Sequence, residues 1–284
     1  MAPIRIAFSP DSDDMFMFWP LLAGKIDTEG LRFEASRADT EWLNERAGVD
    51  DLDVVAVSIA RYPSIADRYL LLPHGMSVGR GFGPVVVSAR ARDLGSLAKA
   101  RIGVPGLRTT AYTVLRLLLP NFEAVVLPIS PFSLVFEALR AGRVDAALLI
   151  HEGRLTYERE GLVCVRDLGA AWGEATAGLP LPLGGNAVRR ALGPDLVSAV
   201  SRVCRSSIAW ALDHRDETMG ALLANESRAD LALDRATLDS YLSMYANEDT
   251  LEARTDVRQA IDELYARAFA AGILPNSARA QFSA

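Results

Sequence analysis

The strongest constraint on the fold is the regular alternation of short apolar runs with segments of helical spacing in the first half of the chain. Short apolar runs bounded by turn residues predict strands, and apolar residues three or four positions apart predict helices. The predicted strands are residues 4–8, 53–57, 84–89, 101–104, 124–127 and 145–150, and the helices between them are 14–23, 59–67, 109–119 and 132–141. This alternation favours βα units and largely parallel sheets, so we predict an α/β fold.

The pattern becomes purely helical after residue 192. The predicted helices are 195–213, 217–225, 234–244 and 255–271, with breaks at 193–194 and 225–227. Leu233, Leu238, Leu242 and Tyr245 could form an apolar stripe, which core packing explains more simply than a dimer interface does. A monomer and a homodimer both stay open. Residues 278–284 are expected to be a loosely held tail.

Two loop-like segments divide the chain into two lobes. The first is polar and covers residues 90–95, and the second is rich in Pro and Gly and covers residues 179–185. We therefore predict a large lobe of residues 1–89 and 186–284 and a small inserted lobe of residues 90–185. Two chain crossings between α/β lobes are typical of binding proteins that close on a hinge around a ligand.

Composition and charge narrow the classes of function. Half of the 284 residues are hydrophobic and 23% are charged, so a large packed core can form. The net charge of −6 argues against a nucleic-acid-binding surface. We also expect no membrane span and no secretory signal, hence a cytoplasmic protein. Cys164 and Cys204 lie in apolar segments without nearby metal-ligand spacing, so we expect two buried thiols and no metal site.

Ligands of open α/β sheets bind beyond the carboxyl ends of strands, and four segments with polar side chains lie there. The first is Ser9–Asp14, where Asp13 or Asp14 is expected to cap a helix. Its helix start could also bind an anion, but three aspartates weaken that attraction, and the segment is better suited to a pocket wall. The second is Ser58, which could be a cap or a ligand contact.

The third segment is Gly106–Tyr112. Thr109 and Thr110 are expected to open a helix, where their hydroxyls and the adjacent N–H groups can converge on a carboxylate. Capping alone explains one threonine but not the whole arrangement. Gly103 and Gly106 do not complete a phosphate-binding fingerprint.

The fourth segment begins with His151, directly after a predicted buried strand, and continues through Glu152 and Arg154. Histidine titrates near neutrality and is the usual general base, although a structural role is equally compatible with this position. His74 and His214 are expected at the surface. No Ser-His-Asp spacing or nucleophile elbow supports acyl-transfer chemistry.

Several of these segments carry a family resemblance. Residues 79–84 (GRGFGP), 105–112 (PGLRTTAY), 150–157 (IHEGRLTY) and 178–184 (GLPLPLG) resemble, in this order, the 1,4-dihydroxy-6-naphthoate synthases. These enzymes belong to the futalosine route to menaquinone, and the resemblance covers nearly the whole chain.

The resemblance implies a type II periplasmic-binding-protein-like fold used for catalysis. It implies a lyase that converts cyclic dehypoxanthinylfutalosine to 1,4-dihydroxy-6-naphthoate without a metal or organic cofactor. Carried over by position, His151 is the base, and a histidine at that position distinguishes the synthases from the related chorismate dehydratases. The resemblance also makes Ser58, Thr110 and Ala111 ligand contacts. Together with the candidates from the polar segments, the full set of expected ligand contacts is Ser9, Asp14, Ser58, Arg108, Thr109, Thr110, Ala111 and Tyr157.

The first loop departs from the pattern of the family. The synthases usually carry Ser-Pro-Cys-Pro-Asn-Asp-Thr, whereas this chain has Asp11, Ser12, Asp13 and Met15 at the variable positions. Carboxylates thus replace neutral groups beside the expected pocket, where a buried charge would disfavour an anionic substrate or shift its own pKa. Two alternatives therefore stay open: a non-catalytic carboxylate-binding protein or sensor, and an enzyme acting on another carboxylated substrate. Turnover that depends on His151 separates the synthase from the binder.

Overall fold

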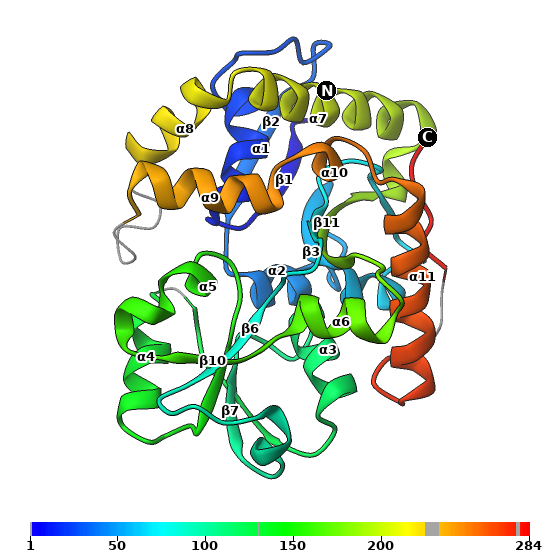
Figure 1. Cartoon of the computed structure of the whole chain (residues 1–284). Helices are drawn as coiled ribbons and strands as arrows, with labels where there is room; N and C mark the ends of the chain where they lie inside the picture. The colour runs from blue at the N-terminus through cyan, green and yellow to red at the C-terminus, as the bar shows by residue number, and fades with distance from the viewer. Residues whose placement is uncertain (1, 130, 225–232, 277–278) are drawn as a thin grey trace.

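A computed structural model describes residues 2–129, 131–224, 233–276 and 279–284, which form two lobes that each contain one sheet (Figure 1). The first sheet has the strand order β2 (Phe33–Arg37), β1 (Ile4–Phe8), β3 (Val54–Ser58), β11 (Leu181–Arg189) and β4 (Tyr69–Leu71), and β5 (Ser77–Gly79) also pairs with β11. The second has the order β10 (Val163–Asp167), β6 (Val85–Ser88), β9 (Ala146–Leu149), β7 (Arg101–Val104) and β8 (Glu123–Val126).

Both sheets are mixed rather than largely parallel. β1 runs parallel to β2 and β3, and β7 runs parallel to β8 and β9, as expected for βα units. β11 is antiparallel to β3, and β6 is antiparallel to β9 and β10. The antiparallel strands are the ones that follow a crossing between lobes, or that pair with such a strand.

Helices cover the sheets and fill the top of the first lobe (Figure 1). In chain order they are α1 (Ser12–Leu22), α2 (Thr40–Arg46), η1 (Ile59–Ser64), η2 (Leu94–Leu97), α3 (Thr110–Leu118), α4 (Ser133–Arg140), α5 (Gly153–Thr156), η3 (Tyr157–Glu160), α6 (Leu168–Ala175), η4 (Arg190–Leu192), α7 (Pro194–Asp213), α8 (Arg215–Ala224), α9 (Arg235–Tyr245), α10 (Glu248–Leu251) and α11 (Thr255–Ala270). Within the described ranges, no helix is long and apolar enough to cross a membrane.

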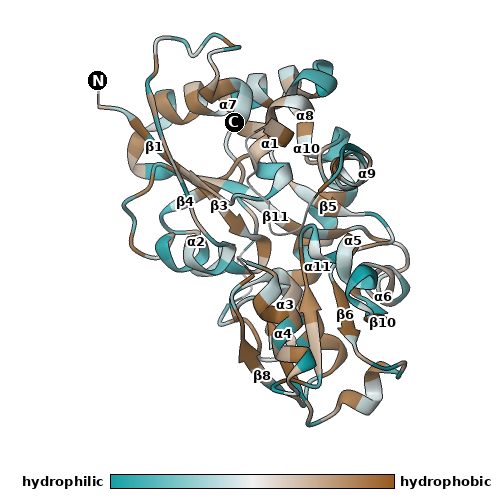
Figure 2. Ribbon diagram, turned by 90° about the vertical axis from the view of Figure 1, so that its left-hand side faces the viewer, coloured by the Kyte–Doolittle hydropathy of each residue, from teal (hydrophilic) through white to brown (hydrophobic). Residues whose placement is uncertain are grey.

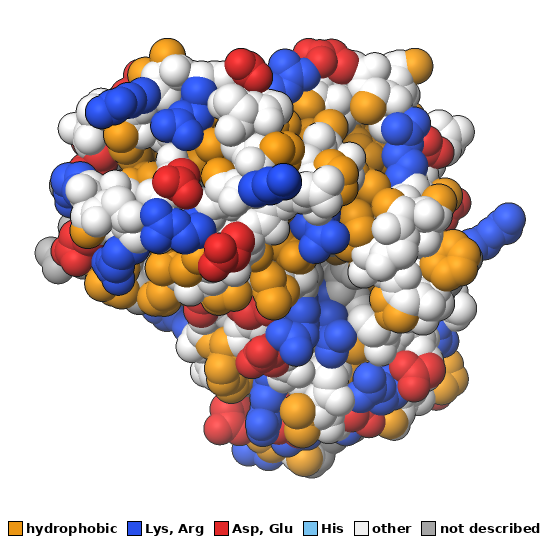
Figure 3. Space-filling model, turned by 90° about the horizontal axis from the view of Figure 1, so that it is seen from below, with side chains coloured by type: hydrophobic (Ala, Val, Ile, Leu, Met, Phe, Trp, Pro, Cys, Tyr) orange, Lys and Arg blue, Asp and Glu red, His pale blue; other side chains and the backbone are white. Residues whose placement is uncertain are grey.

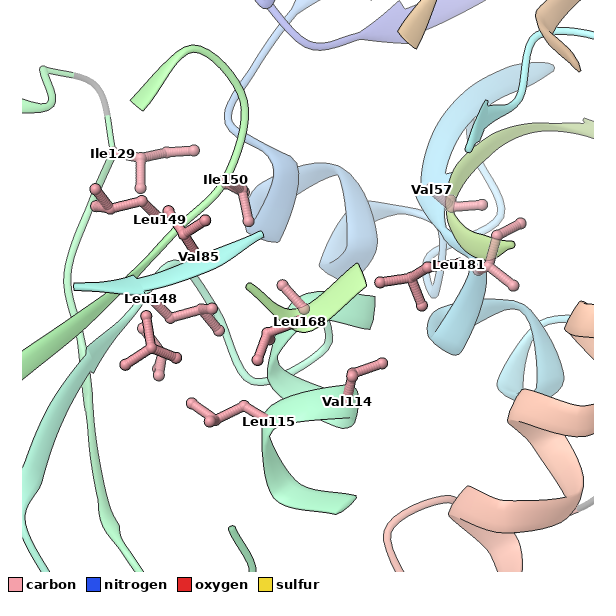
Figure 4. Packing of buried hydrophobic residues seen from close by; sticks show 14 of the residues in the cluster. Val57, Val85, Val114, Leu115, Ile129, Leu148, Leu149, Ile150, Leu168 and Leu181 are labelled. Atoms are coloured by element: carbon pink, nitrogen blue, oxygen red, sulfur yellow. The ribbon is translucent and has the colours of Figure 1, made fainter. Parts of the chain in front are cut away.

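The strands of both sheets are predominantly apolar, and their buried side chains form the cores (Figure 2). In the second lobe, Val85 of β6 and Leu148 of β9 pack with Leu115 of α3 (Figure 4). The same cluster continues to Val57 and Leu181 in the first sheet, so the lobes share a continuous apolar core. A separate cluster packs α1 and α7 against the first sheet.

The chain crosses between the sheets at residues 80–84 and 176–180. The predicted lobe boundaries differ from this at both crossings, because β6 belongs to the second sheet and the first residues of β11 belong to the first sheet. An apolar run buried on both faces looks the same in either sheet, which explains the shift at β6. At the crossings a Cβ on Gly169 would lie 1.9 Å from the Phe82 carbonyl oxygen, so the close backbone approach there requires glycine.

The C-terminal tail is tied down, contrary to the sequence prediction. The Leu71 N–H donates to the Gln281 carbonyl at 2.9 Å, and the Ser283 N–H donates to the Leu71 carbonyl at 2.8 Å. Residues 281–283 thereby lie against β4 at the edge of the first sheet, with a parallel bridge between Leu71 and Phe282. The predicted break at residues 225–227 lies outside the described residues.

Three further predictions, two on single residues and one on a segment, are wrong. His74 is 2% exposed rather than a surface residue, and Cys164 is exposed rather than buried. The segment 179–185, predicted as a hinge loop, is largely strand β11. In contrast, Leu238 and Leu242 are buried, as core packing of the helical stripe requires.

Charged side chains on the second lobe are mixed in sign. Seen from below, basic and acidic side chains are interspersed over the surface (Figure 3). Arg101 lies 3.6 Å from Asp145, and Arg140 lies 2.8 Å from Glu160, so neighbouring opposite charges form local ion pairs.

Candidate functional site

A cleft between the lobes encloses about 760 Å³, including its opening to solvent. Volumes of this order are typical of pockets for small molecules. The loops after β1 and β3 reach it from the first lobe, and the loops after β7 and β9 reach it from the second. Its polar lining residues are Ser9, Asp13, Asp14, Thr40, Ser58, Ser77, Thr109, Thr110, His151, Arg154, Tyr241 and Tyr245.

The loop after β1 forms a buried acidic side of the cleft. Asp11 occupies the N-cap position of α1 but its side chain makes no capping bond, so the prediction of Asp13 or Asp14 as the cap is wrong. Asp13 instead accepts hydrogen bonds from the hydroxyls of Ser77 (2.5 Å) and Tyr241 (3.0 Å). The loop aspartates therefore organise side chains of the cleft rather than the start of the helix.

Burial, joined at Asp14 by a close acidic neighbour, raises the pKa values of two carboxyl groups on this side of the cleft. Burial, followed by repulsion from Asp13, raises the pKa of Asp14 to about 7, while Asp14 accepts the Ser9 N–H at 2.8 Å. Burial also raises the pKa of Glu152, whose Oε1 accepts the Ser12 N–H at 2.8 Å across the cleft. Carboxyl groups that are harder to ionise reduce the negative charge that an anionic ligand would meet.

His151 lies in the cleft at the end of β9, as predicted. Its backbone has a φ of +52°, an uncommon conformation that clusters at functional sites for residues other than glycine. The ring Nε2 lies 3.1 Å from Thr40 Oγ1 and 3.0 Å from Asp11 Oδ2, and the side chain is 18% exposed. The ring is therefore held on one edge while it still borders the pocket.

The opposite side of the cleft presents hydroxyl and backbone N–H groups. Ser58 is buried, and its Oγ accepts a hydrogen bond from Asn44 Nδ2 at 3.0 Å. Because Ser58 is the acceptor in that bond, its own hydroxyl proton can be donated to a ligand.

Thr109 and Thr110 open α3, as the sequence predicts. Thr109 Oγ1 caps the helix by accepting the Tyr112 N–H at 3.1 Å. Thr110 Oγ1 accepts the Ala60 N–H at 3.1 Å and donates to the Leu183 carbonyl at 2.7 Å. These hydroxyls thus hold the local structure. Thr110 and Ala111 line the cleft, and their first-turn N–H groups have no acceptor within the helix, so such groups can bind an anion.

Ser9, Asp14, Ser58, Thr109, Thr110 and Ala111 all line the cleft together with His151. Two other predicted contacts do not line it. Arg108 points to α2, where it pairs with Glu41 (2.9 Å) and Glu45 (2.8 Å). Tyr157 begins η3, and its hydroxyl lies 3.4 Å from Glu158.

Several lining residues were not predicted. Thr40 and Ser77 belong to segments without a strong apolar pattern, and Tyr241 comes from a helix far along the chain. Asp39 caps α2 and was a helix-start signal that could have pointed to the next residue, Thr40. Among the residues that the structure describes, no group of three His, Cys, Asp or Glu side chains could hold a metal ion.

Comparison with protein families and curated proteins gives a consistent result. The family model described as menaquinone biosynthesis matches residues 4–270. A 1,4-dihydroxy-6-naphthoate synthase of Thermus thermophilus is 37% identical, covering 99% of this chain and 100% of its own length. The enzyme of the same name from Streptomyces coelicolor is 34% identical, covering 96% of this chain and 95% of its own length.

Solved structures show the same architecture. A protein of Archaeoglobus fulgidus is 40% identical with a TM-score of 0.89, covering 96% of this chain and 98% of its own. The alkanesulfonate-binding protein SsuA of Xanthomonas axonopodis pv. citri has a TM-score of 0.73 at 14% identity, covering 99% of this chain and 96% of its own. At that identity the likeness shows the fold alone, which is the predicted periplasmic-binding-protein-like fold.

Proposed function

Because the chain belongs to the menaquinone biosynthesis family, we propose that it is a 1,4-dihydroxy-6-naphthoate synthase. In this proposal it is a cytoplasmic carbon–carbon lyase that converts cyclic dehypoxanthinylfutalosine to 1,4-dihydroxy-6-naphthoate. The relatives of that name, which match nearly the whole chain, support the assignment. The structural observation that carries it is the position of His151, held on one edge by Asp11 and Thr40 at the border of the cleft.

In the proposed mechanism, neutral His151 removes the proton of a hydroxyl on the sugar-derived part of the substrate. The electron pair of that O–H bond forms a carbonyl, the adjacent carbon–carbon bond breaks, and its electron pair passes to the ring fragment. Proton transfer from carbon to oxygen then converts the released ring fragment to its aromatic hydroxyl form, so no further group has to leave. A positioned general base of this kind contributes about 10²–10⁴-fold to the rate.

The other side of the cleft would bind the carboxylate of the substrate. The N–H groups of Thr110 and Ala111 lie at the positive end of the α3 dipole, and Ser58 can donate a hydroxyl proton beside them. The Ser12–Glu152 hydrogen bond joins the lobes at the opposite side, so the substrate would be enclosed between them. Enclosure excludes water and restricts the reacting groups to a narrow range of positions.

The test is incubation of the protein with cyclic dehypoxanthinylfutalosine, with product followed by mass. The native chain should form 1,4-dihydroxy-6-naphthoate, and His151→Asn should lose most of the rate. Asn is the better replacement than Ala because it tolerates the positive φ of this position. His214→Asn is the matched control, because His214 is exposed and stacks on Trp210.

Each outcome has a distinct meaning. Turnover by the native chain and the His214 variant, but not by His151→Asn, supports the synthase and its base. A folded native chain that binds the substrate without converting it contradicts the proposal and favours the carboxylate-binding protein. Equal turnover by the His151 variant leaves the synthase in place but removes His151 as the base.

A further inference from the structure

Two loops that lie 140 residues apart in the sequence meet at the imidazole of His151. Asp11 Oδ2 lies 3.0 Å from His151 Nε2, and Asp11 is 1% exposed. The neighbouring pair, Ser12 and Glu152, is joined by the 2.8 Å hydrogen bond from the Ser12 N–H. The first loop of one lobe therefore meets the β9 loop of the other at two adjacent positions.

The backbone holds Asp11 in this place. Its N–H donates to Ser9 Oγ at 3.2 Å, and its carbonyl accepts the Met15 N–H of α1 at 2.9 Å. The side chain makes no capping bond to α1, and its carboxylate lies beside the imidazole of His151. An N-cap aspartate ordinarily accepts a helix N–H, so this orientation is specific to the site.

The chemistry of a carboxylate next to a ring nitrogen decides which nitrogen carries the proton. An ionised carboxylate only accepts hydrogen bonds and would repel a nitrogen lone pair at 3.0 Å. A proton on Nε2 turns this repulsion into attraction, and Thr40 Oγ1, at 3.1 Å, can accept from the same N–H. The lone pair of the neutral ring then lies on Nδ1.

We propose that Asp11 is a positioning residue that keeps the His151 proton on Nε2 and leaves Nδ1 as the basic atom. The inference rests on the proposed role of His151 as the general base. Asp11 is one of the positions at which the first loop departs from the usual synthase pattern. When the ring gains a proton from the substrate, the buried carboxylate also stabilises the imidazolium.

The experiment that tests the proposal reads the tautomer directly. Two-bond nitrogen–proton correlation spectra of the isotope-labelled protein distinguish Nε2–H from Nδ1–H at about pH 8, above the ordinary titration range of histidine. The chain has three histidines, and His151→Asn identifies the signal of this one. We expect Nε2–H in the native chain and a shift toward Nδ1–H in Asp11→Asn, because an amide NH₂ can donate to Nε2.

Two variants serve as controls for this measurement. Asp13→Asn removes a charge from the same loop, but Asp13 bonds to Ser77 and Tyr241, so the tautomer of His151 should not change. Thr40→Val removes the other partner of Nε2 and should also leave Nε2–H, because Asp11 remains. A tautomer that follows Thr40 rather than Asp11 would overturn the proposal.

Kinetics supply the second readout. In Asp11→Asn, kcat for the conversion should fall by about 10²–10⁴-fold, as for other carboxylates that orient a catalytic histidine, whereas KM should change little. Native protein with Nδ1–H, or an unchanged tautomer in Asp11→Asn, refutes the assignment whether or not the chain is active. Absence of turnover in the native chain refutes the proposed function instead, so the two failures are distinguishable.

Discussion

The two sides of the cleft differ in how they bury polar groups. The acidic side consists of Asp13 and Asp14, which line the cleft, and of Asp11 and Glu152, which are buried beside them outside the lining. The amide side, made of Ser58, Thr109, Thr110 and Ala111, presents hydroxyls and the N-terminal N–H groups of α3. Buried carboxyl groups exchange protons with the medium and with a histidine, whereas N–H groups at a helix start attract an anion without titrating. This difference supports our proposal that the first side transfers protons and the second binds a carboxylate.

The largest expected effect tests the acidic side through Asp14. Folding raises the pKa of Asp14 from its ordinary value of 3.8 to about 7, chiefly by burial. The folded protein therefore retains a proton that the unfolded chain has released, and stability falls as pH rises between these two values. Asp14→Asn removes this penalty and can keep an acceptor for the Ser9 N–H. The variant should gain about 3 kcal/mol relative to the native chain between about pH 5 and pH 8.

The measurement is the free energy of unfolding by denaturant at both pH values. Asp13→Asn is the informative control, since repulsion from Asp13 is the second cause of the raised pKa of Asp14. It should reduce the pH dependence without abolishing it. A native chain whose stability does not decrease over this range would show that Asp14 ionises easily, and the distinction between the two sides would then be weaker.

A smaller effect is expected at Thr110 on the amide side. The Thr110 hydroxyl joins the Ala60 N–H to the Leu183 carbonyl, so Thr110→Val leaves two backbone groups without their partner. Loss of such a buried contact costs about 1–2 kcal/mol of stability. Affinity for 1,4-dihydroxy-6-naphthoate, measured by calorimetry, should change little, because the backbone N–H groups of Thr110 and Ala111 remain. Thr110→Ser keeps the hydroxyl and is the matched control.

The opposite result would change the role that we assign to the Thr110 hydroxyl. If Thr110→Val has native stability but binds the product much more weakly, the hydroxyl contacts the ligand directly. The amide side would then bind through side chains, as the sequence alone suggested for Thr109 and Thr110.

The sequence predicted the strands and helices that form the cleft more accurately than it predicted the contacts between residues within the cleft. Strand ends are visible as apolar runs followed by polar residues, so His151 and Ser58 could be placed at the site. The contact between Asp11 and His151 could not be foreseen, because it depends on how two lobes close over residues that are distant in the chain. The antiparallel strand β11, which follows the second crossing between the lobes, was also not predicted, because its Pro and Gly residues are typical of a loop.

The smallest effect is expected at Arg108, where sequence and structure disagree most directly. Arg108 was one of the expected ligand contacts, but its guanidinium instead pairs with Glu41 and Glu45 on α2. Partly exposed ion pairs of this kind contribute about 0–1 kcal/mol, so Arg108→Ala should alter stability and KM only slightly. Steady-state kinetics beside Ser58→Ala, which removes a hydroxyl that borders the cleft, provide the comparison. A KM that rises more for Arg108→Ala than for Ser58→Ala would mean that the arginine turns into the cleft when substrate binds, and that the amide side recognises the carboxylate through a charge as well.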